Sequence, residues 1–337
     1  MKKPFVYITR KLESDIVEKL GNIAEVQMWD SIEKPVPYDI LKEKASKAHA
    51  LLTMVSDKVD ESLIASAPYL KVIANLGVGY DNIAVHEATK RKILVCNTPD
   101  VLSDTTADLT FALLMATARR IVEGHEYIKK GHWQDWNPYL MAGYDIHHKT
   151  IGIVGMGRIG EKVAKRATGF EMNILYHNRS RKQKAEEELG AKYVSFEELL
   201  GQSDFVVSLA PLTPETKGMF NKKAFSLMKN SAIFINAGRG LVMNEADLYD
   251  ALVNKEIAAA GLDVFEKEPI SANHPLLKLQ NVVVLPHIGS ASLETRKKMM
   301  KLAVDNIDLA LQGKEPKALV NREIWNEKKS QLHNKAF

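Results

Sequence analysis

The feature that most constrains the fold of this chain is the segment TIGIVGMGRIG, residues 150–160. An apolar run precedes three glycines, Gly155, Gly157 and Gly160, in the spacing G-x-G-x-x-G, and the amphipathic stretch EKVAKRATGF comes next. Between a strand and a helix, such glycines permit a tight turn, close approach of the backbone to a pyrophosphate, and close helix packing. The segment therefore predicts a dinucleotide-binding β/α unit. A glycine turn without a ligand, and a flavin or S-adenosylmethionine site, are the alternatives.

Short apolar runs alternate with amphipathic ones along the whole chain. The runs are FVYIT, AEVQMW, ALLTM, KVIANLG and ILVCNT in the first part, then TIGIVG, NILYHN, DFVVSLAP, SAIFINAG, AAAGLDVF and VVVLPHI. This alternation is typical of parallel sheets covered by helices on both faces, and 337 residues exceed what one hydrophobic core usually organises. We expect an α/β protein of two Rossmann-like domains, each a doubly wound parallel sheet, with the active-site cleft between them.

Two long helical stretches are also expected. One runs from about Ser103 to Lys130 and ends at Gly131, and the other runs from Leu293 to about Gly313. The first carries more Leu, Ala and Met than one buried face needs, and the aromatic segment GHWQDWNPYL lies directly after it. This excess of apolar residues favours a two-fold homodimer built on residues 103–140.

Composition excludes several classes of protein. The net charge is +4 without a basic block, which argues against a nucleic-acid partner. No apolar run approaches the roughly 18 residues of a membrane span, and the only cysteine, Cys96, cannot form an internal disulfide. The adjacent His147 and His148 lack a second ligand pair, so no metal is expected. We expect a soluble, cytoplasmic protein that binds small anions and no membrane.

The stretch LYHNRSRK, residues 175–182, indicates which dinucleotide is bound. Where an acidic residue would bond the ribose 2′-hydroxyl of NAD, this chain has Asn178, and then Arg179, Ser180 and Arg181. A carboxylate would repel a 2′-phosphate, whereas guanidinium groups bond phosphate oxygens in a planar fork. The stretch predicts a strong preference for NADPH over NADH. A solvated basic loop that opens a helix at residues 183–189 is the alternative.

Three further motifs place polar residues at or just beyond the ends of apolar strands, and Glu268 follows in the next loop. NAGRG contains Arg239, GLDVFEKEP contains Asp263 and Glu268, and LPHIGSAS contains His287. An Arg can bind a carboxylate through two N–H groups, and a His paired with a Glu can stay protonated near neutral pH and donate a proton. Each residue alone has an ordinary structural explanation. Together, behind a dinucleotide motif, they predict a site for a small anionic substrate.

The motifs GMGRIG, NAGRG, GLDVFEKEP and PHIGSAS, in this order and spacing, resemble those of the D-2-hydroxyacid dehydrogenase family, and more narrowly its glyoxylate/hydroxypyruvate reductase branch. The segments LGVGYDNI, NTPDVLSDTTADLT and LVNRE resemble the same branch, so the resemblance covers nearly the whole chain. It implies a discontinuous substrate domain of residues 1–100 and 290–337, and a dinucleotide-binding domain of residues 101–289. It also implies that the segment with Trp136 reaches toward the neighbouring active site of a dimer.

The resemblance implies a role for each matching residue. Arg239 would bind the substrate carboxylate and keto oxygen, His287 would protonate the keto oxygen, and Glu268 would keep His287 charged. The backbone amides of Val78 and Gly79 would bind the carboxylate as well, while Asp263 would hold the nicotinamide amide. The implied cofactor-binding set comprises Gly155, Gly157, Arg158, Ile159, Gly160, Asn178, Arg179, Ser180, Arg181, Pro211, Thr216, Ala237, Asp263 and Gly289.

The resemblance thus predicts an NADPH-dependent reductase of small 2-keto acids such as glyoxylate and hydroxypyruvate. Glu268 is present where formate dehydrogenases of similar fold lack the acid, which disfavours formate oxidation. Reduction of a sugar acid such as 2-ketogluconate remains an alternative, since the sequence does not fix the loops over the substrate. An NAD(P)H-sensing interaction protein is the alternative of another class.

Overall fold

The computed structural model describes residues 3–327, and the chain divides into two compact units. Unit 1 comprises Met1–Leu102 and Ser292–Phe337, and unit 2 comprises Ser103–Ala291. The expected substrate domain includes residues 1–2 and 328–337, which lie outside the described residues. The assignment of one unit to the substrate and the other to the dinucleotide stays a prediction.

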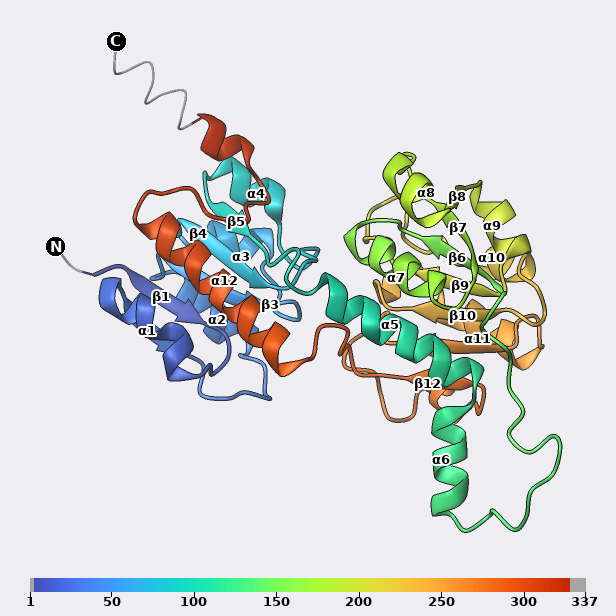
Figure 1. Cartoon of the computed structure of the whole chain (residues 1–337). Coiled ribbons are helices and arrows are strands. Elements are labelled where there is room, and N and C mark those ends of the chain that lie inside the picture. The colour runs from blue at the N-terminus through green and yellow to red at the C-terminus, as the bar shows by residue number, and fades with distance from the viewer. Residues whose placement is uncertain (1–2, 328–337) are drawn as a thin grey trace. The chain divides into compact units, whose positions relative to one another are not determined.

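Unit 1 contains a five-stranded parallel sheet in the order β2-β1-β3-β4-β5. Its strands are β1 (Phe5–Ile8), β2 (Glu25–Met28), β3 (Ala50–Met54), β4 (Val72–Leu76) and β5 (Leu94–Cys96). Its helices are α1 (Ser14–Ile23), α2 (Tyr38–Ala45), α3 (Glu61–Ala65), α4 (Val85–Lys90) and α12 (Leu293–Leu311). The apolar runs expected as strands in this part of the chain are all strands, and α12 returns the chain to unit 1 (Figure 1).

Unit 2 contains a seven-stranded parallel sheet in the order β12-β11-β10-β9-β6-β7-β8. Its strands are β6 (Thr150–Val154), β7 (Asn173–His177), β8 (Lys192–Tyr193), β9 (Phe205–Ser208), β10 (Ile233–Asn236), β11 (Ala259–Leu262) and β12 (Val282–Val284). Its α-helices are α5 (Ser103–Ala118), α6 (Ile121–Lys129), α7 (Arg158–Thr168), α8 (Gln183–Leu189), α9 (Phe196–Gln202), α10 (Lys222–Ser226) and α11 (Glu245–Val253). Two 3₁₀ turns, η1 (Gly240–Val242) and η2 (Pro275–Lys278), complete it. The prediction of two parallel α/β sheets is confirmed.

The sheet of unit 2 is buried on both faces. Along β9, Val206 belongs to one apolar cluster, whereas Phe205 and Val207 belong to another. Successive side chains of a strand point to opposite faces, so the two clusters lie on opposite sides of the sheet. This burial explains why the strands are continuous apolar runs. The two-residue strand β8, which carries Lys192 and Tyr193, has no such run and was not expected.

The prediction of a single helix for residues 103–130 is wrong. The structure has two helices, α5 and α6, which are separated at Arg120, whose backbone is left-handed with φ of 52°. The carbonyl of Ala118 accepts the N–H of Tyr144 at 2.9 Å, and Arg120 pairs with Glu123 at 2.6 Å. The N–H of Tyr144 thus bonds a carbonyl at the last residue of α5, so a contact distant in sequence ends the helix. Figure 1 shows α6 projecting from the rest of unit 2.

Among residues 3–327, the protein contains no helix with the length and apolar character needed to span a membrane.

Candidate active site

The glycine loop lies at the point where the strand order of unit 2 reverses. β6 and β9 are neighbours there, although two strands separate them in the chain. Gly155 has φ of +102°, and a Cβ on it would lie 2.6 Å from the backbone nitrogen of Ala210. A Cβ on Gly160 would lie 2.4 Å from the carbonyl oxygen of Gly155. Gly157 has no neighbouring atom within 4 Å of such a Cβ, so the loop is closed toward the sheet and open at Gly157, which fits a pyrophosphate.

Two other predicted cofactor residues come directly after the glycine loop. Arg158 and Ile159 begin α7, with Arg158 exposed and Ile159 partly buried against the core. Their backbone N–H groups lie in the first turn of the helix, where N–H groups have no carbonyl partner within the same helix. The start of α7 therefore fits the phosphate site that the motif predicts.

Asn178 lies directly after β7 and is joined to the glycine loop. Its Oδ1 accepts the N–H of Met156 at 2.7 Å, and its Nδ2 donates to the carbonyl of Met156 at 3.1 Å. The hydroxyl of Tyr193 donates to the carbonyl of Asn178 at 3.1 Å. The side chains of the next two residues, Arg179 and Ser180, are exposed. Asn178 thus fixes the end of β7 against the residues that were expected to hold the pyrophosphate.

Arg181 is already ion-paired. Its Nε donates to Oε1 of Glu186 at 3.1 Å, and its Nη2 donates to the other oxygen of the same carboxylate. The hydrogen bonds from Arg181 and then from Tyr176 lower the pKa of Glu186. Sequence analysis missed both Tyr176 and Glu186. The only signal was their position, one within β7 and one in the first turn of the next helix.

Pro211, Thr216 and Ala237 belong to connections after β9 and β10. The hydroxyl of Thr216 donates to the carbonyl of Pro211 at 2.6 Å and accepts the N–H of Thr213 at 2.8 Å. The N–H of Ala237 donates to the carbonyl of Ser208 at 3.3 Å. These bonds close the loop after β9, so all three residues lie at the same edge of the sheet as the glycine loop.

His287 and Glu268 form a hydrogen-bonded pair. Nδ1 of His287 lies 2.7 Å from Oε2 of Glu268, and the two side chains are 32% and 34% exposed. The other oxygen of Glu268 accepts the N–H of Phe265 at 3.0 Å. Burial acts to raise the pKa of Glu268, but the bond to His287, its charge and the N–H of Phe265 outweigh burial and lower the pKa. The carboxylate is therefore ionised at neutral pH and accepts a hydrogen bond from Nδ1 of His287.

Asp263 holds the turn that carries His287. Its two carboxylate oxygens accept the N–H groups of Ile288 and Gly289, each at 2.8 Å, and its carbonyl accepts the N–H of His287 at 2.9 Å. Burial raises the pKa of Asp263, and the backbone donors offset this only in part. His287 has a left-handed backbone with φ of 54°, a conformation that is uncommon for residues with a side chain. Three bonds to Asp263 stabilise this conformation.

Arg239 lies beyond the end of β10 and near the same pair. Asn236 donates from Nδ2 to the carbonyl of Arg239 at 3.0 Å and accepts the N–H of Gly238 at 3.1 Å. The charge of Arg239 contributes to the lowered pKa of Glu268, after the larger effects of burial and His287. A Cβ on Gly240 would lie 1.8 Å from the backbone of Phe265, so the two segments touch directly. The structure thus brings Arg239, Glu268 and His287 together at one sheet edge.

Val78 and Gly79 belong to unit 1, in the loop after β4. The carbonyl of Val78 accepts Nδ2 of Asn97 at 2.8 Å, and the carbonyl of Gly79 accepts Nδ2 of Asn75 at 2.8 Å. With both carbonyls engaged by buried or half-buried amides, the loop conformation is well defined. The substrate-binding role of the two backbone N–H groups stays a prediction.

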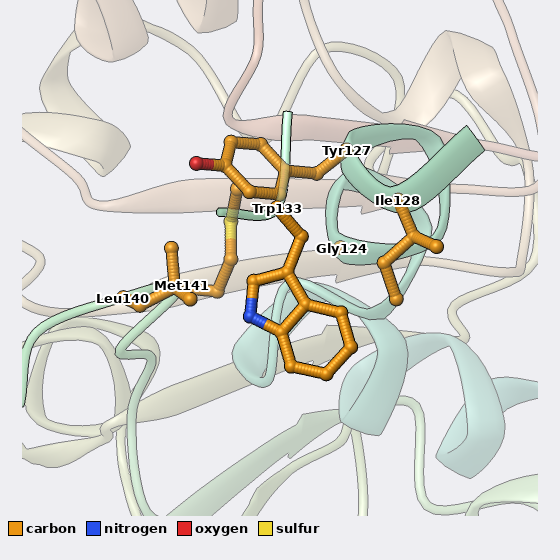
Figure 2. Close-up of a pocket in the computed structure, with 6 residues that line it drawn as sticks. All are labelled: Gly124, Tyr127, Ile128, Trp133, Leu140 and Met141. Atoms are coloured by element: carbon orange, nitrogen blue, oxygen red, sulfur yellow. The ribbon is translucent and has the colours of Figure 1, made fainter. Parts of the chain in front are cut away.

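The aromatic segment after α6 is exposed. Trp136 and Tyr139 are 74% and 85% exposed, and the N–H of Trp136 donates locally to Asp135 at 2.7 Å. A hollow of about 250 Å³ lies between α6 and this segment. Figure 2 shows the residues that line it, which are Gly124, Tyr127, Ile128, Trp133, Leu140 and Met141. Within residues 3–327 no hydrogen bond joins Trp136 to His287, and the expected role of Trp136 across a dimer stays a prediction.

Comparison with known proteins gives the context of this site. Residues 111–289 match the model of the D-isomer specific 2-hydroxyacid dehydrogenase NAD binding domain. Glyoxylate reductase of Thermococcus litoralis is 49% identical over 96% of this chain and 98% of its own length, and that of Pyrococcus horikoshii is 48% identical over 96% and 97%.

A solved structure agrees with these relatives. An NADPH-dependent glyoxylate/hydroxypyruvate reductase from Sinorhizobium meliloti, solved with NADP and malonate, has a TM-score of 0.84, is 31% identical, and covers 95% of this chain and 97% of its own. The match of the NAD binding domain to unit 2 agrees with the glycine loop found there, so the protein is an NAD(P)-dependent oxidoreductase. The chain belongs to the D-isomer specific 2-hydroxyacid dehydrogenase family.

Proposed function

We propose that this protein reduces glyoxylate and hydroxypyruvate to 2-hydroxy acids with NADPH. The observation that carries the proposal is the 2.7 Å pair of His287 and Glu268 at the sheet edge that also bears the glycine loop and Arg239. A proton donor, a cation and a dinucleotide site are the three requirements of keto acid reduction. The relatives named glyoxylate reductase support the substrate class.

The proposed chemistry assigns each group one task. The cofactor supplies a hydride to the keto carbon. The guanidinium of Arg239 binds the substrate carboxylate and polarises the keto oxygen, because a charge-assisted bond orients as well as attracts. His287 donates a proton to that oxygen from Nε2, while Nδ1 remains bonded to Glu268. The backbone amides of Val78 and Gly79 complete the binding of the carboxylate in this proposal.

Asp263 has two tasks in the proposal. Its three bonds to the backbone of residues 287–289 position His287, and its carboxylate also holds the nicotinamide amide. A carboxylate has about four lone-pair sites, so two backbone donors leave capacity for a further N–H. Gly289, whose N–H donates to Asp263, lies in the same turn.

The preference for NADPH rests on the loop that begins at the end of β7. Asn178 supplies no negative charge, and the exposed Arg179 and Ser180 offer donors beside it. Arg179 contributes to the lowered pKa of Glu215, after closer hydrogen bonds, so its positive charge acts on this edge of unit 2. The S. meliloti reductase, which is named as NADPH-dependent, supports the same cofactor.

A homodimer is the proposed assembly. The side chains of α5 that pack inward are buried in unit 2, whereas α6 has no buried residue and exposes Ile121, Val122 and Ile128. The excess apolar surface thus lies on α6 and on the adjoining aromatic segment, including Trp136. Exposed apolar patches of this kind are typical of subunit interfaces. Light scattering at micromolar concentration tests the assembly, and a monomer would contradict it.

The substrate is tested by measuring NADPH oxidation with a panel of 2-keto acids that includes glyoxylate, hydroxypyruvate, 2-ketogluconate and pyruvate. We expect the two small acids to give the highest kcat/KM. A maximum with 2-ketogluconate would favour the sugar acid alternative. Binding of NADPH without turnover of any acid would favour a sensing protein.

A cytoplasmic location is also part of the proposal. Burial raises the pKa of the Cys96 thiol to about 12, so this thiol is unreactive.

A further inference from the structure

We propose that Tyr176 and Glu186 are positioning residues for the 2′-phosphate of the cofactor. In this inference they tie down the loop of residues 178–182 and aim Arg181, and so they set the preference between NADPH and NADH. The inference rests on the proposed NADPH preference. Neither residue was expected to act at the site from the sequence.

One end of the loop is fixed by Asn178. Its carboxamide bonds the backbone of Met156 in both directions, at 2.7 and 3.1 Å, and its carbonyl accepts the hydroxyl of Tyr193. The start of the loop therefore moves with the glycine loop. A phosphate-binding group at this end has a defined distance from the pyrophosphate site.

The other end of the loop is fixed by Tyr176. Its ring is buried in β7 with 0% exposure, and its hydroxyl accepts the N–H of Lys182 at 2.6 Å. The same hydroxyl donates to Oε1 of Glu186 at 2.6 Å. A single buried hydroxyl therefore joins the backbone at the end of the loop to the carboxylate on α8. Arg179 and Ser180 lie between two fixed ends.

Glu186 in turn orients Arg181. The guanidinium uses its Nε and Nη2 edge for the carboxylate, and a guanidinium has five N–H donors in a planar fork. The edge formed by Nη1 and Nη2 is thus directed away from Glu186 and can bind a second anion. The side chain of Glu186 is 18% exposed and that of Arg181 is 64% exposed, so an anchored carboxylate holds an exposed cation.

Two effects of Glu186 oppose each other, and their sizes decide the outcome. Its negative charge weakens attraction of a phosphate, but this charge is shared with Arg181 and with the hydroxyl of Tyr176. An exposed ion pair contributes little to stability by itself. Restricting a flexible Arg before the ligand binds removes an entropic cost of binding. We therefore expect orientation to exceed repulsion, so that loss of Glu186 weakens phosphate binding.

The experiment compares ligands that differ only in the 2′-phosphate. Calorimetry gives the Kd of adenosine 2′,5′-bisphosphate and of 5′-AMP for the intact protein and for the variants Tyr176→Phe and Glu186→Ala. Steady-state assays give KM for NADPH and for NADH. One hydrogen bond is worth about 0.5–1.5 kcal/mol net, which corresponds to a roughly two- to tenfold change in Kd. We expect this increase for the bisphosphate and NADPH, and none for 5′-AMP and NADH.

Tyr249→Phe is the matched control. Tyr249 is a half-buried residue of α11, and its hydroxyl has no hydrogen bond within the described part of the chain. Its loss should change no Kd. Glu186→Ala replaces a partly buried side chain of a short helix with a good helix former, so we expect this variant to fold even if Tyr176→Phe does not.

Three results would overturn the inference. Equal weakening of both ligand classes would show a general structural role. Tighter binding of the bisphosphate to Glu186→Ala would show that Glu186 competes with phosphate for Arg181. Unchanged constants in both variants would show that the loop needs neither residue. If the unmodified protein bound 5′-AMP and the bisphosphate equally, the NADPH preference itself would fail, which is a distinct result.

Discussion

Each of the two sheets has a point where the strand order reverses, but the residues at the two points differ. In unit 2 the strand order reverses between β6 and β9, and a glycine loop that is open at Gly157 lies directly after β6. In unit 1 the order reverses between β1 and β3, and there the chain places Thr9, Arg10 and Asp57. Ligands bind at such reversal points in open α/β sheets. The residues after the strands, rather than the strand order, decide whether the point stays open.

The reversal point of unit 1 is filled by its own side chains. Nη1 of Arg10 lies 3.3 Å from Asp57, and these side chains are 11% and 2% exposed. Asp57 also accepts the N–H of Met54 at 2.7 Å and bonds the hydroxyl of Thr9. The hydrogen-bonded pair of unit 2, His287 and Glu268, is by contrast about a third exposed. A buried network stabilises a fold, whereas a partly exposed pair can exchange a proton with a substrate.

The largest effect is expected for His287→Ala. Removing a general acid usually lowers kcat by about 10² to 10⁴, and the Kd for the cofactor should be almost unchanged. The measurement is NADPH oxidation with glyoxylate at saturating cofactor. His147→Ala is the control, because His147 is 63% exposed and lies far along the chain from the site. Near-normal turnover of His287→Ala would show that His287 is not the proton donor. The pair in unit 2 would then have no chemical role to set against the structural role of Asp57 in unit 1.

Asp57→Ala should affect stability rather than chemistry. Breaking a buried ion pair by removing one partner costs about 3–5 kcal/mol, because Arg10 would be left without its carboxylate. Chemical denaturation measures the loss, while calorimetry should give an unchanged Kd for NADPH. Asp30→Ala is the control, since Asp30 is 92% exposed in its pair with Lys11. A stable variant with weakened NADPH binding would show that the unit 1 edge is not merely structural.

Asn178→Asp combined with Arg179→Ser should reduce the preference for NADPH. One charge-assisted contact to the 2′-phosphate is worth about 1.5–3 kcal/mol, so the ratio of kcat/KM for the two cofactors should fall by roughly 10- to 100-fold. The change should appear mainly in KM for NADPH, because the phosphate is remote from the reacting carbon. Rising salt should weaken the preference of the unmodified protein. An enzyme that used both cofactors equally would contradict the assignment.

Sequence alone predicted the features that depend on local pattern. Strands such as β9 and β10 are short, fully buried apolar runs, and the glycine spacing of residues 155–160 reports a backbone requirement directly. The break at Arg120 depends on the bond between Tyr144 and Ala118, which no local pattern reveals. An isolated helix pattern continued through this point, and the tertiary contact overrode it.

In the candidate site, too, the residues that belong to local motifs could be predicted, whereas contacts between side chains could not. Arg239, Glu268 and His287 were proposed because each belongs to a recognisable motif at or after the end of a strand, and the structure places them near one another. The pairing of Arg181 with Glu186 was not proposed, since five residues across a helix start do not fix a contact. The hydrogen bonds from the turn at His287 to Asp263 were also not predicted. A carboxylate that accepts backbone N–H groups has no sequence pattern that would reveal it.

The smallest effect is expected for Glu268→Gln, and it tests whether the exposed pair of unit 2 titrates. In the proposed chemistry His287 donates the proton, and its hydrogen-bond partner is the ionised Glu268, whose pKa is lowered despite burial. Without the negative charge this partner of Nδ1 is lost, so we expect the alkaline fall of kcat/KM to move toward acid. Glu197→Gln, on the exposed face of α9, is the control. An unmoved profile in Glu268→Gln would mean that the pair holds His287 in place, as Asp57 holds its own turn, and does not set its charge.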